Sequence, residues 1–169
     1  MYYQLEMVLS GFFIRGGWSI GELFINEQIL YGYPMIESYK LETQKALNPR
    51  IIFSEKMKVK INEHLSFYNS KYLAPQKFHV LKDNDGEYFI NYLYCILDYE
   101  GIANYNYLKS HKCIIESRMK LFEKNDKILA KYVWCAYYHN YFCNTFINNC
   151  PKEYLIPNTC VDWNFSLIP

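Results

Sequence analysis

Short apolar runs alternate with amphipathic stretches along the first half of the chain. Short apolar runs between turn residues are typical of strands, and apolar residues three and four positions apart are typical of helices. Pro34 fits the first turn of a helix, Pro49 disfavours helix at the residue before it, and Ser54 fits an N-cap. The predicted elements are a helix over 1–9, strands over 12–25, 28–31 and 50–53, and helices over 34–47 and 55–67.

The second half of the chain begins with a predicted hairpin and continues with helices. The tetrapeptide Asp-Asn-Asp-Gly at 83–86 is typical of a tight turn, and apolar strands flank it over 77–81 and 87–93. Residues 102–147 have helical spacing, with a break near Asn125. The second of these helices is apolar or aromatic nearly all round, which predicts burial on several sides or at an interface.

This order of elements predicts an α+β fold. Strands mixed with helices and hairpins favour an α+β layer with helices on one face. We expect three segments: an α+β domain over 1–98, a helical hairpin as an extension over 99–150, and an irregular tail over 151–169. The tail contains three prolines and shows little periodicity.

The composition indicates a packed protein with balanced charge. Apolar residues make up 51% of the chain and aromatic residues 19%. The 18 basic and 17 acidic side chains give a net charge of +1, which argues against nucleic acid or a membrane surface as the partner. The sequence contains neither a long apolar run nor a basic leader, so we predict no membrane span and no secretion signal.

The six cysteines allow two interpretations. An even number of cysteines suits disulfides in a secreted protein, but without a secretion signal we favour reduced, cytoplasmic thiols that pack as small apolar side chains. Cys135, His139 and Cys143 recur at four-residue spacing and could bind a soft metal, but no fourth ligand is nearby, so we favour packing. The cysteines are Cys95, Cys113, Cys135, Cys143, Cys150 and Cys160.

Five of the seven glycines precede residue 33. The spacing of Gly16, Gly17 and Gly21 matches neither of the common phosphate-binding loops and follows a predicted strand. We therefore expect these glycines to let a strand twist and a helix approach closely.

Two charged clusters also suggest simple structural roles. The acidic residues Asp83, Asp85 and Glu87 lack the spacing of a calcium loop and fit a turn. The lysines at 56, 58 and 60 lie around a predicted helix, so we expect them to be solvated.

Residues 12–93 resemble the C-terminal part of a class III nucleotidyl cyclase catalytic domain. The stretch 15–22, Arg-Gly-Gly-Trp-Ser-Ile-Gly-Glu, is similar to the family's strand R-x-G-[IV]-x-x-G-x. Residues 29–42 resemble its short strand, Trp-Gly step and following helix, which ends in Leu-Glu, and 49–55 resemble its next strand and helix start. The hairpin at 82–93 lies where the family has its last hairpin. The motifs Arg-Gly-Gly, Tyr-Gly-Tyr-Pro and Lys-Tyr-Val-Trp, with a later His-Asn, resemble a set of bacterial cyclase-like proteins.

The resemblance implies a ferredoxin-like half-domain, with a mixed, mostly antiparallel sheet and helices on one face, whose metal site is missing. The family binds two divalent metals through two aspartates that precede the Arg-Gly-Gly strand, whereas this chain has fourteen residues before Arg15 and no aspartate before Asp83. We therefore expect an N-terminally incomplete domain. The resemblance implies no cofactor for this chain alone, and Mg²⁺ or Mn²⁺ only where a partner chain completes the site.

The family's remaining functional positions transfer poorly to this sequence. The base-selecting polar residue falls on Ile29, the ribose-orienting asparagine on Ile36, and the transition-state arginine on Lys40. Isoleucine cannot donate or accept these hydrogen bonds, and lysine retains the charge of arginine without its bidentate geometry. Lys40 is thus the one candidate catalytic residue, and the nucleotide-binding residues are unknown.

Three functional hypotheses follow from this resemblance and its gaps. The first is a catalytically inert fragment or degenerate cyclase-like domain. The second is a binding or assembly module, either a homo-oligomer or one half of a pair with a complementing chain that supplies the aspartates. The third is an unrelated enzyme whose site the sequence does not reveal.

Overall fold

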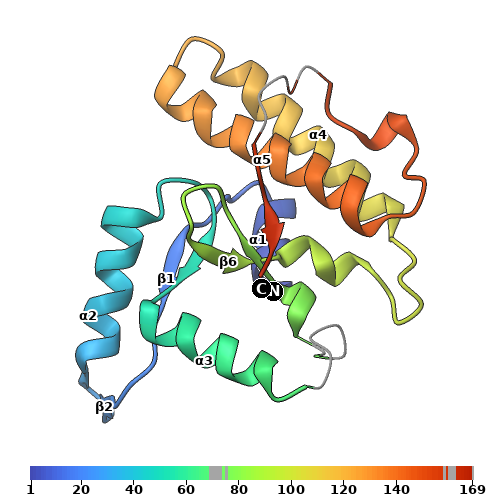
Figure 1. Cartoon of the computed structure of the whole chain (residues 1–169). Coiled ribbons are helices and arrows are strands. Elements are labelled where there is room, and N and C mark those ends of the chain that lie inside the picture. Colours follow the sequence, from blue (N-terminus) through green and yellow to red (C-terminus); the bar gives the residue numbers. More distant parts are fainter. Residues whose placement is uncertain (69–73, 75, 158, 160–162, 169) are drawn as a thin grey trace. The chain divides into compact units, whose positions relative to one another are not determined.

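The computed structural model describes residues 1–68, 74, 76–157, 159 and 163–168 and has the predicted α+β fold (Figure 1). The chain forms two compact units, each made of segments far apart in sequence. We call Arg15–Ile90 with Ser166–Pro169 the sheet unit, and Met1–Ile14 with Asn91–Phe165 the helical unit.

The sheet unit contains a mixed, mostly antiparallel sheet, as expected. β1 is parallel to β4, and the other three pairs, β4–β6, β6–β5 and β5–β7, are antiparallel. A separate two-stranded antiparallel sheet precedes the first helix of this unit. The main sheet has the order β1 (Gly16–Trp18), β4 (Ile51–Phe53), β6 (Tyr88–Ile90), β5 (Val80–Lys82) and β7 (Ser166–Leu167), and the small one pairs β2 (Phe24–Ile25) with β3 (Leu30–Tyr31).

Two helices of the sheet unit begin where the sequence indicates. The Ser54 hydroxyl accepts a hydrogen bond from the Met57 N–H at 3.3 Å, which confirms the predicted cap of α3. α2 packs closely on β1, because a Cβ added at Gly17 would meet Ser38 O and would lie 2.5 Å from Leu41 Cβ. The helices are α2 (Tyr33–Lys40), continued by a π-helical turn η1 (Leu41–Lys45), then α3 (Glu55–Ser66) and the 3₁₀ turn η3 (Lys77–His79).

The helical unit is built around two antiparallel helices, α4 and α5, which lie side by side (Figure 1). Each begins at an asparagine whose side chain accepts a backbone N–H: Asn104 for α4 and Asn125 for α5. The predicted break near Asn125 is therefore confirmed. Its helices are α1 (Tyr2–Leu9), η4 (Tyr92–Ile96), α4 (Tyr105–Leu121), α5 (Asp126–Phe146) and η5 (Lys152–Tyr154).

The first fourteen residues pack with this helical unit. Phe13 contacts Tyr132 with ring centroids 5.2 Å apart, and Arg118 Nη2 donates to Gly11 O at 3.4 Å. Gly11 follows the end of α1 with φ 88°, a left-handed conformation that is common after a helix. The compact units therefore differ from the expected segments 1–98, 99–150 and 151–169, because ring and hydrogen-bond contacts join parts that are distant in sequence.

Several predicted strands are shorter in the structure. The expected strand over 12–25 is divided into β1 and β2, and the expected strand over 77–81 begins as a 3₁₀ turn. The strand over 87–93 ends at Ile90, where η4 follows. The expected irregular tail also contributes β7, whose Leu167 pairs with Leu81. Within the described part of the chain, every helix is too short or too polar to cross a membrane.

Candidate functional site

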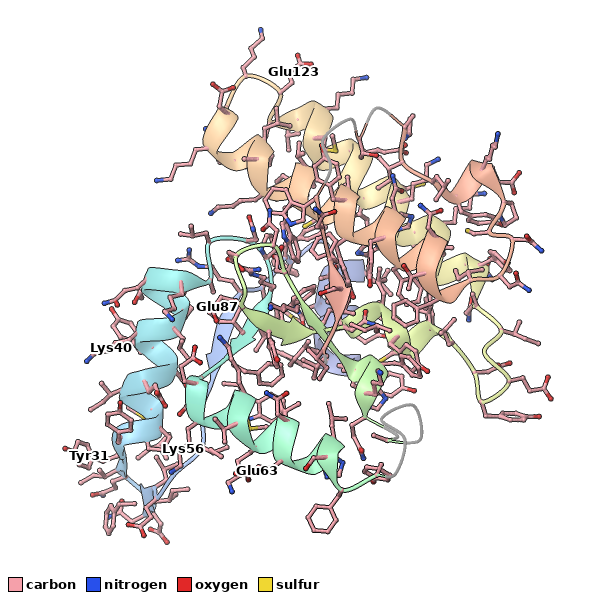
Figure 2. The ribbon with its side chains drawn as sticks, viewed as in Figure 1. Tyr31, Lys40, Lys56, Glu63, Glu87 and Glu123 are labelled. Atoms are coloured by element: carbon pink, nitrogen blue, oxygen red, sulfur yellow. The ribbon has the colours of Figure 1, made fainter. Side chains whose placement is uncertain are left out.

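Lys40 is the last residue of α2, and its side chain is exposed. Figure 2 shows it extending outward from the continuous helical segment that α2 and η1 form. Among the described residues, none forms an ion pair with Lys40, so its ammonium group can receive an external anion. Ile36, one turn earlier, and Ile29, directly before β3, are also exposed. The three positions that the cyclase resemblance assigns therefore lie on the surface of the sheet unit.

β1 is the terminal strand of the main sheet. Its residues alternate in direction: Gly16 N–H donates to Arg50 O at 3.1 Å, and Trp18 O accepts from Ser54 N–H at 2.9 Å. Because a parallel strand bonds one neighbour through alternate residues, the N–H and C=O of Gly17 face away from β4. This edge can therefore accept a further strand.

The β2–β3 hairpin is apolar on both of its faces. Its four strand side chains are all exposed, and Asn26 closes its turn by accepting the N–H of Gln28 at 2.9 Å and of Ile29 at 2.6 Å. An isolated two-stranded hairpin of apolar side chains is only marginally stable in water. We call its exposed apolar residues the hairpin surface, defined as Phe24, Ile25, Ile29, Leu30 and Tyr31.

The segment that contains the hairpin surface carries only acidic charges. Residues 16–39 contain three glutamates and no lysine or arginine. Glu37 accepts a hydrogen bond from Ser19, and Glu22 and Glu27 are exposed. A protein that binds this surface would therefore need apolar side chains at its centre and basic side chains around them.

The acidic turn at 83–86 binds a buried arginine. Arg50, at the start of β4, is 1% exposed and forms ion pairs with both Asp83 and Asp85. Burial by itself would raise the pKa of Asp85, but the hydrogen bonds and charge of Arg50 outweigh it, so this pKa is lowered. The first two aspartates of the chain are thus bound to Arg50, which links the turn to β4.

Glu87 has a similar structural role. Lys58 Nζ lies 2.6 Å from one oxygen of Glu87, and Lys45 Nζ lies 3.1 Å from the other. Burial alone would raise the pKa of Glu87, but the two lysines lower it overall. Lys58 is largely buried and lies over the Tyr88 ring, so the expectation that it is solvated is wrong; Lys56 and Lys60 are exposed as expected.

A chain of hydrogen bonds crosses the core of the helical unit. Tyr92 Oη lies 2.9 Å from His111 Nε2, His111 Nδ1 lies 2.9 Å from His139 Nδ1, and His139 Nε2 lies 2.8 Å from Tyr154 O. Both histidines are completely buried. Burial lowers the pKa of His139 to about 4 and that of His111 well below its ordinary value, so both rings are neutral at pH 7.

The Tyr154 carbonyl at the end of this series of hydrogen bonds determines which nitrogen of each histidine carries the proton. Tyr154 O can only accept, so His139 carries its proton on Nε2 and has a bare Nδ1. His111 must then donate from Nδ1, which leaves its Nε2 to accept from the Tyr92 hydroxyl. One set of tautomers satisfies all four groups.

The same geometry argues against the metal site considered for Cys135, His139 and Cys143. Cys143 Sγ lies 3.6 Å from His139 Nε2, but this nitrogen donates to Tyr154 O and has no lone pair for a metal. Within the described residues, no group of three or more His, Cys, Asp or Glu side chains is arranged to bind a metal ion.

The comparisons add no family to these observations. The chain matches no protein-family model, no curated protein and no solved structure. The functional argument therefore rests on the residues described above.

Proposed function

We propose that this chain is a half-domain of the class III nucleotidyl cyclase type that forms no cyclic nucleotide by itself. The resemblance of residues 12–93 supports the class, and the mixed sheet of the sheet unit is compatible with it. The catalytic step needs two metal ions that join the ribose hydroxyl and the phosphate. The first aspartates of this sequence are Asp83 and Asp85, and both are paired with Arg50.

We further propose that the chain is an assembly module. The observation that supports this role best is the outward-facing backbone of Gly17 on β1, in the same unit as the exposed hairpin surface. Backbone hydrogen bonds to an added strand give affinity, and apolar side chains beside it give specificity. The partner would be a different chain that supplies a strand and the two metal-binding aspartates, because a second copy lacks the same aspartates.

In such a complex Lys40 would face the nucleotide. Its exposed ammonium group, without an ion pair among the described residues, would bind a phosphate oxygen, while Mg²⁺ or Mn²⁺ would be bound by the partner's aspartates. Lysine would supply positive charge without the bidentate contact of arginine, so we expect a weaker phosphate contact than in a complete cyclase.

The first experiment tests the chain alone. Purified protein is incubated with ATP, GTP, CTP or UTP and either Mg²⁺ or Mn²⁺, and the products are separated by mass spectrometry. We expect no cyclic nucleotide. Formation of one that disappears in Lys40→Ala but not in Lys56→Ala would refute the inert half-domain.

The second experiment identifies the partner. A photo-crosslinking amino acid is placed at Tyr31 on the hairpin surface. The control position is Phe67, another exposed aromatic residue, directly after α3. We expect crosslinks to one protein from Tyr31 only, and we expect that protein to have two metal-binding aspartates and to form a cyclic nucleotide when mixed with this chain. Equal crosslinking from both positions, or a partner without these properties, would contradict the assembly role.

A further inference from the structure

A groove opens in the helical unit where the end of α1 lies beside α4. The two helices pack against each other, and the groove between them has a volume of about 450 Å³. Residues four positions apart share one face of a helix, so the pairs 113/117 and 114/118 present one side of α4 to the groove. The lining residues are Leu9, Ser10 and Gly11 at the end of α1, and Cys113, Ile114, Ser117 and Arg118 on α4.

Arg118 brings a positive charge to this groove. Its Nη2 donates to Gly11 O at 3.4 Å, a long bond to a neutral group. Among the described residues, no aspartate or glutamate forms an ion pair with Arg118. A guanidinium group has five N–H donors, so this half-buried side chain retains donors for an anion from solution.

The wall that faces Arg118 is fixed by backbone hydrogen bonds. Gly11 N–H donates to Val8 O and Phe12 N–H donates to Met7 O, both at 2.8 Å. A Cβ at Gly11 would lie 3.1 Å from Arg118 Nη2, so the glycine leaves the room that the guanidinium group occupies. A site whose walls are already ordered loses less conformational entropy when a ligand binds.

We propose that this groove binds a small organic monocarboxylate, with the carboxylate on Arg118. The planar guanidinium group matches the two oxygens of a carboxylate. The hydroxyl groups of Ser10 and Ser117, which line the same groove, can each donate a further hydrogen bond. Leu9 and Ile114 offer apolar contact to a short hydrocarbon chain.

The charge of the groove favours one negative charge on the ligand over two. Among the described residues that line it, Arg118 is the one that carries a charge. The groove lies at the C-terminal end of α1, where the last carbonyl groups have partial negative charge. A phosphate dianion would bring a second negative charge to these carbonyls without a second cation, so a carboxylate is the better ligand.

The site is independent of the proposed function. Its residues belong to the helical unit and lie outside the cyclase-like stretch 12–93. The thiol of Cys113 is exposed and lines the groove, so its rate of alkylation reports which reagents the groove attracts.

The test alkylates the full chain with iodoacetate, which is a carboxylate, or with iodoacetamide, which is neutral and of similar size. Trypsin cleaves after Lys112 and Arg118, and the peptide 113–118 has Cys113 as its single cysteine, so mass spectrometry follows this thiol alone. The ratio of the two rate constants measures the attraction for a carboxylate, because a change in thiol reactivity affects both reagents. We expect Arg118→Gln, whose peptide ends at Lys120 instead, to lower this ratio about tenfold.

The matched control removes a positive charge outside the groove. Lys124→Gln changes an exposed lysine in the turn after α4 and should alter the ratio less than about twofold. Near-UV circular dichroism checks that both variants keep the wild-type fold. An equal fall in the two folded variants, or no fall in Arg118→Gln, overturns the proposal.

Competition tests the wild-type protein without any substitution. Increasing butyrate should slow the reaction of Cys113 with iodoacetate, whereas its neutral counterpart butyramide, and inorganic phosphate at the same ionic strength, should have little effect. Failure of butyrate to protect Cys113, or equal protection by butyramide, would overturn a carboxylate site. Stronger protection by phosphate than by butyrate would also overturn it, because the groove would then select a different anion.

Discussion

His111 and His139 face each other through their Nδ1 atoms at 2.9 Å, with both rings completely buried on α4 and α5. Only one proton fits between the two nitrogens, and the outer nitrogen of each ring already has a hydrogen-bond partner. If the bare Nδ1 of His139 were protonated, its N–H group would face the N–H group of His111, and the buried ring would carry a positive charge. Nearby Lys112 adds to the cost by its charge, and neither Cys143 nor Tyr138 offers a compensating negative charge at pH 7.

Acid should therefore destabilise the helical unit already at mildly acidic pH, where carboxylates are still ionised. The pKa of His139 falls from 6.5 to about 4 on folding, so the unfolded chain binds more protons below pH 6.5. The contribution of neutral His139 to the unfolding free energy is fully present above pH 6.5. It is lost as the pH falls toward 4, which lowers the unfolding free energy by about 3 kcal/mol for His139 alone. Urea unfolding followed by near-UV circular dichroism between pH 7.5 and 4.5 measures this decrease.

The matched variants make this prediction specific. His139→Gln should lower stability at pH 7.5 and flatten the pH dependence, whereas His64→Gln, which changes an exposed histidine of α3, should leave the wild-type slope. An unchanged slope in His139→Gln would show that other groups cause the acid sensitivity.

Replacement of Arg50 should destabilise the sheet unit more than replacement of an exposed lysine. Arg50→Met removes the guanidinium group that is paired with the buried Asp83 and should cost about 3 kcal/mol of unfolding free energy. Lys60→Met removes an exposed pair with Glu63 and should cost less than about 1 kcal/mol. Chemical denaturation of the two variants compares them, and equal costs would contradict the structural role of Arg50.

Gly17 and Gly16 should respond differently to the same substitution. Gly17→Ala places a methyl group against Ser38 O and Leu41, so we expect a loss of about 1–3 kcal/mol as α2 moves from β1. Gly16→Ala meets Ile51 at an ordinary contact distance of 3.6 Å and should change stability by less than about 1 kcal/mol. Thermal unfolding of both proteins distinguishes these outcomes. An unchanged melting temperature in Gly17→Ala would show that α2 does not pack tightly against β1.

Lys40 should matter for nucleotide only in the assembled complex. Lys40→Ala should leave the melting temperature of this chain unchanged, because the side chain is exposed, and should weaken nucleotide binding by the complex about tenfold. Lys56→Ala removes a lysine from another exposed position and serves as the control. Titration of the complex with a nonhydrolysable triphosphate measures both, and equal affinity in the two variants would remove Lys40 from the proposed site.

Local signals predicted where two of the helices begin. The Ser54 cap and the Asn125 break depend on a side chain that accepts a backbone N–H within a few residues. The turn at 83–86 was equally clear, with Gly86 at φ 85°. Such features can be read from sequence because every participant is adjacent along the chain.

Contacts between distant residues were not predictable in the same way. Arg50 and Asp83 lie 33 positions apart and His111 and His139 lie 28 apart, so no periodicity relates them. The helix pattern predicts a solvated Lys58, because it reveals neither the Tyr88 ring nor Glu87, which bury this lysine. The pairing of Leu167 with Leu81 likewise depends on the folded sheet.

The packing of residues 1–14 with α4 and α5 has a consequence for synthesis. The ribosome makes α1 well before Arg118 and Tyr132, which contact the residues after this helix and follow them more than a hundred positions later. At about 5–20 residues per second, this segment waits several seconds before its partners emerge. The sheet also waits for β7, which follows its partner β5 only after the long helices α4 and α5. Neither unit can close before its distant segment has been translated, so the nascent chain exposes apolar surface until then, and a holding chaperone should bind it during that time.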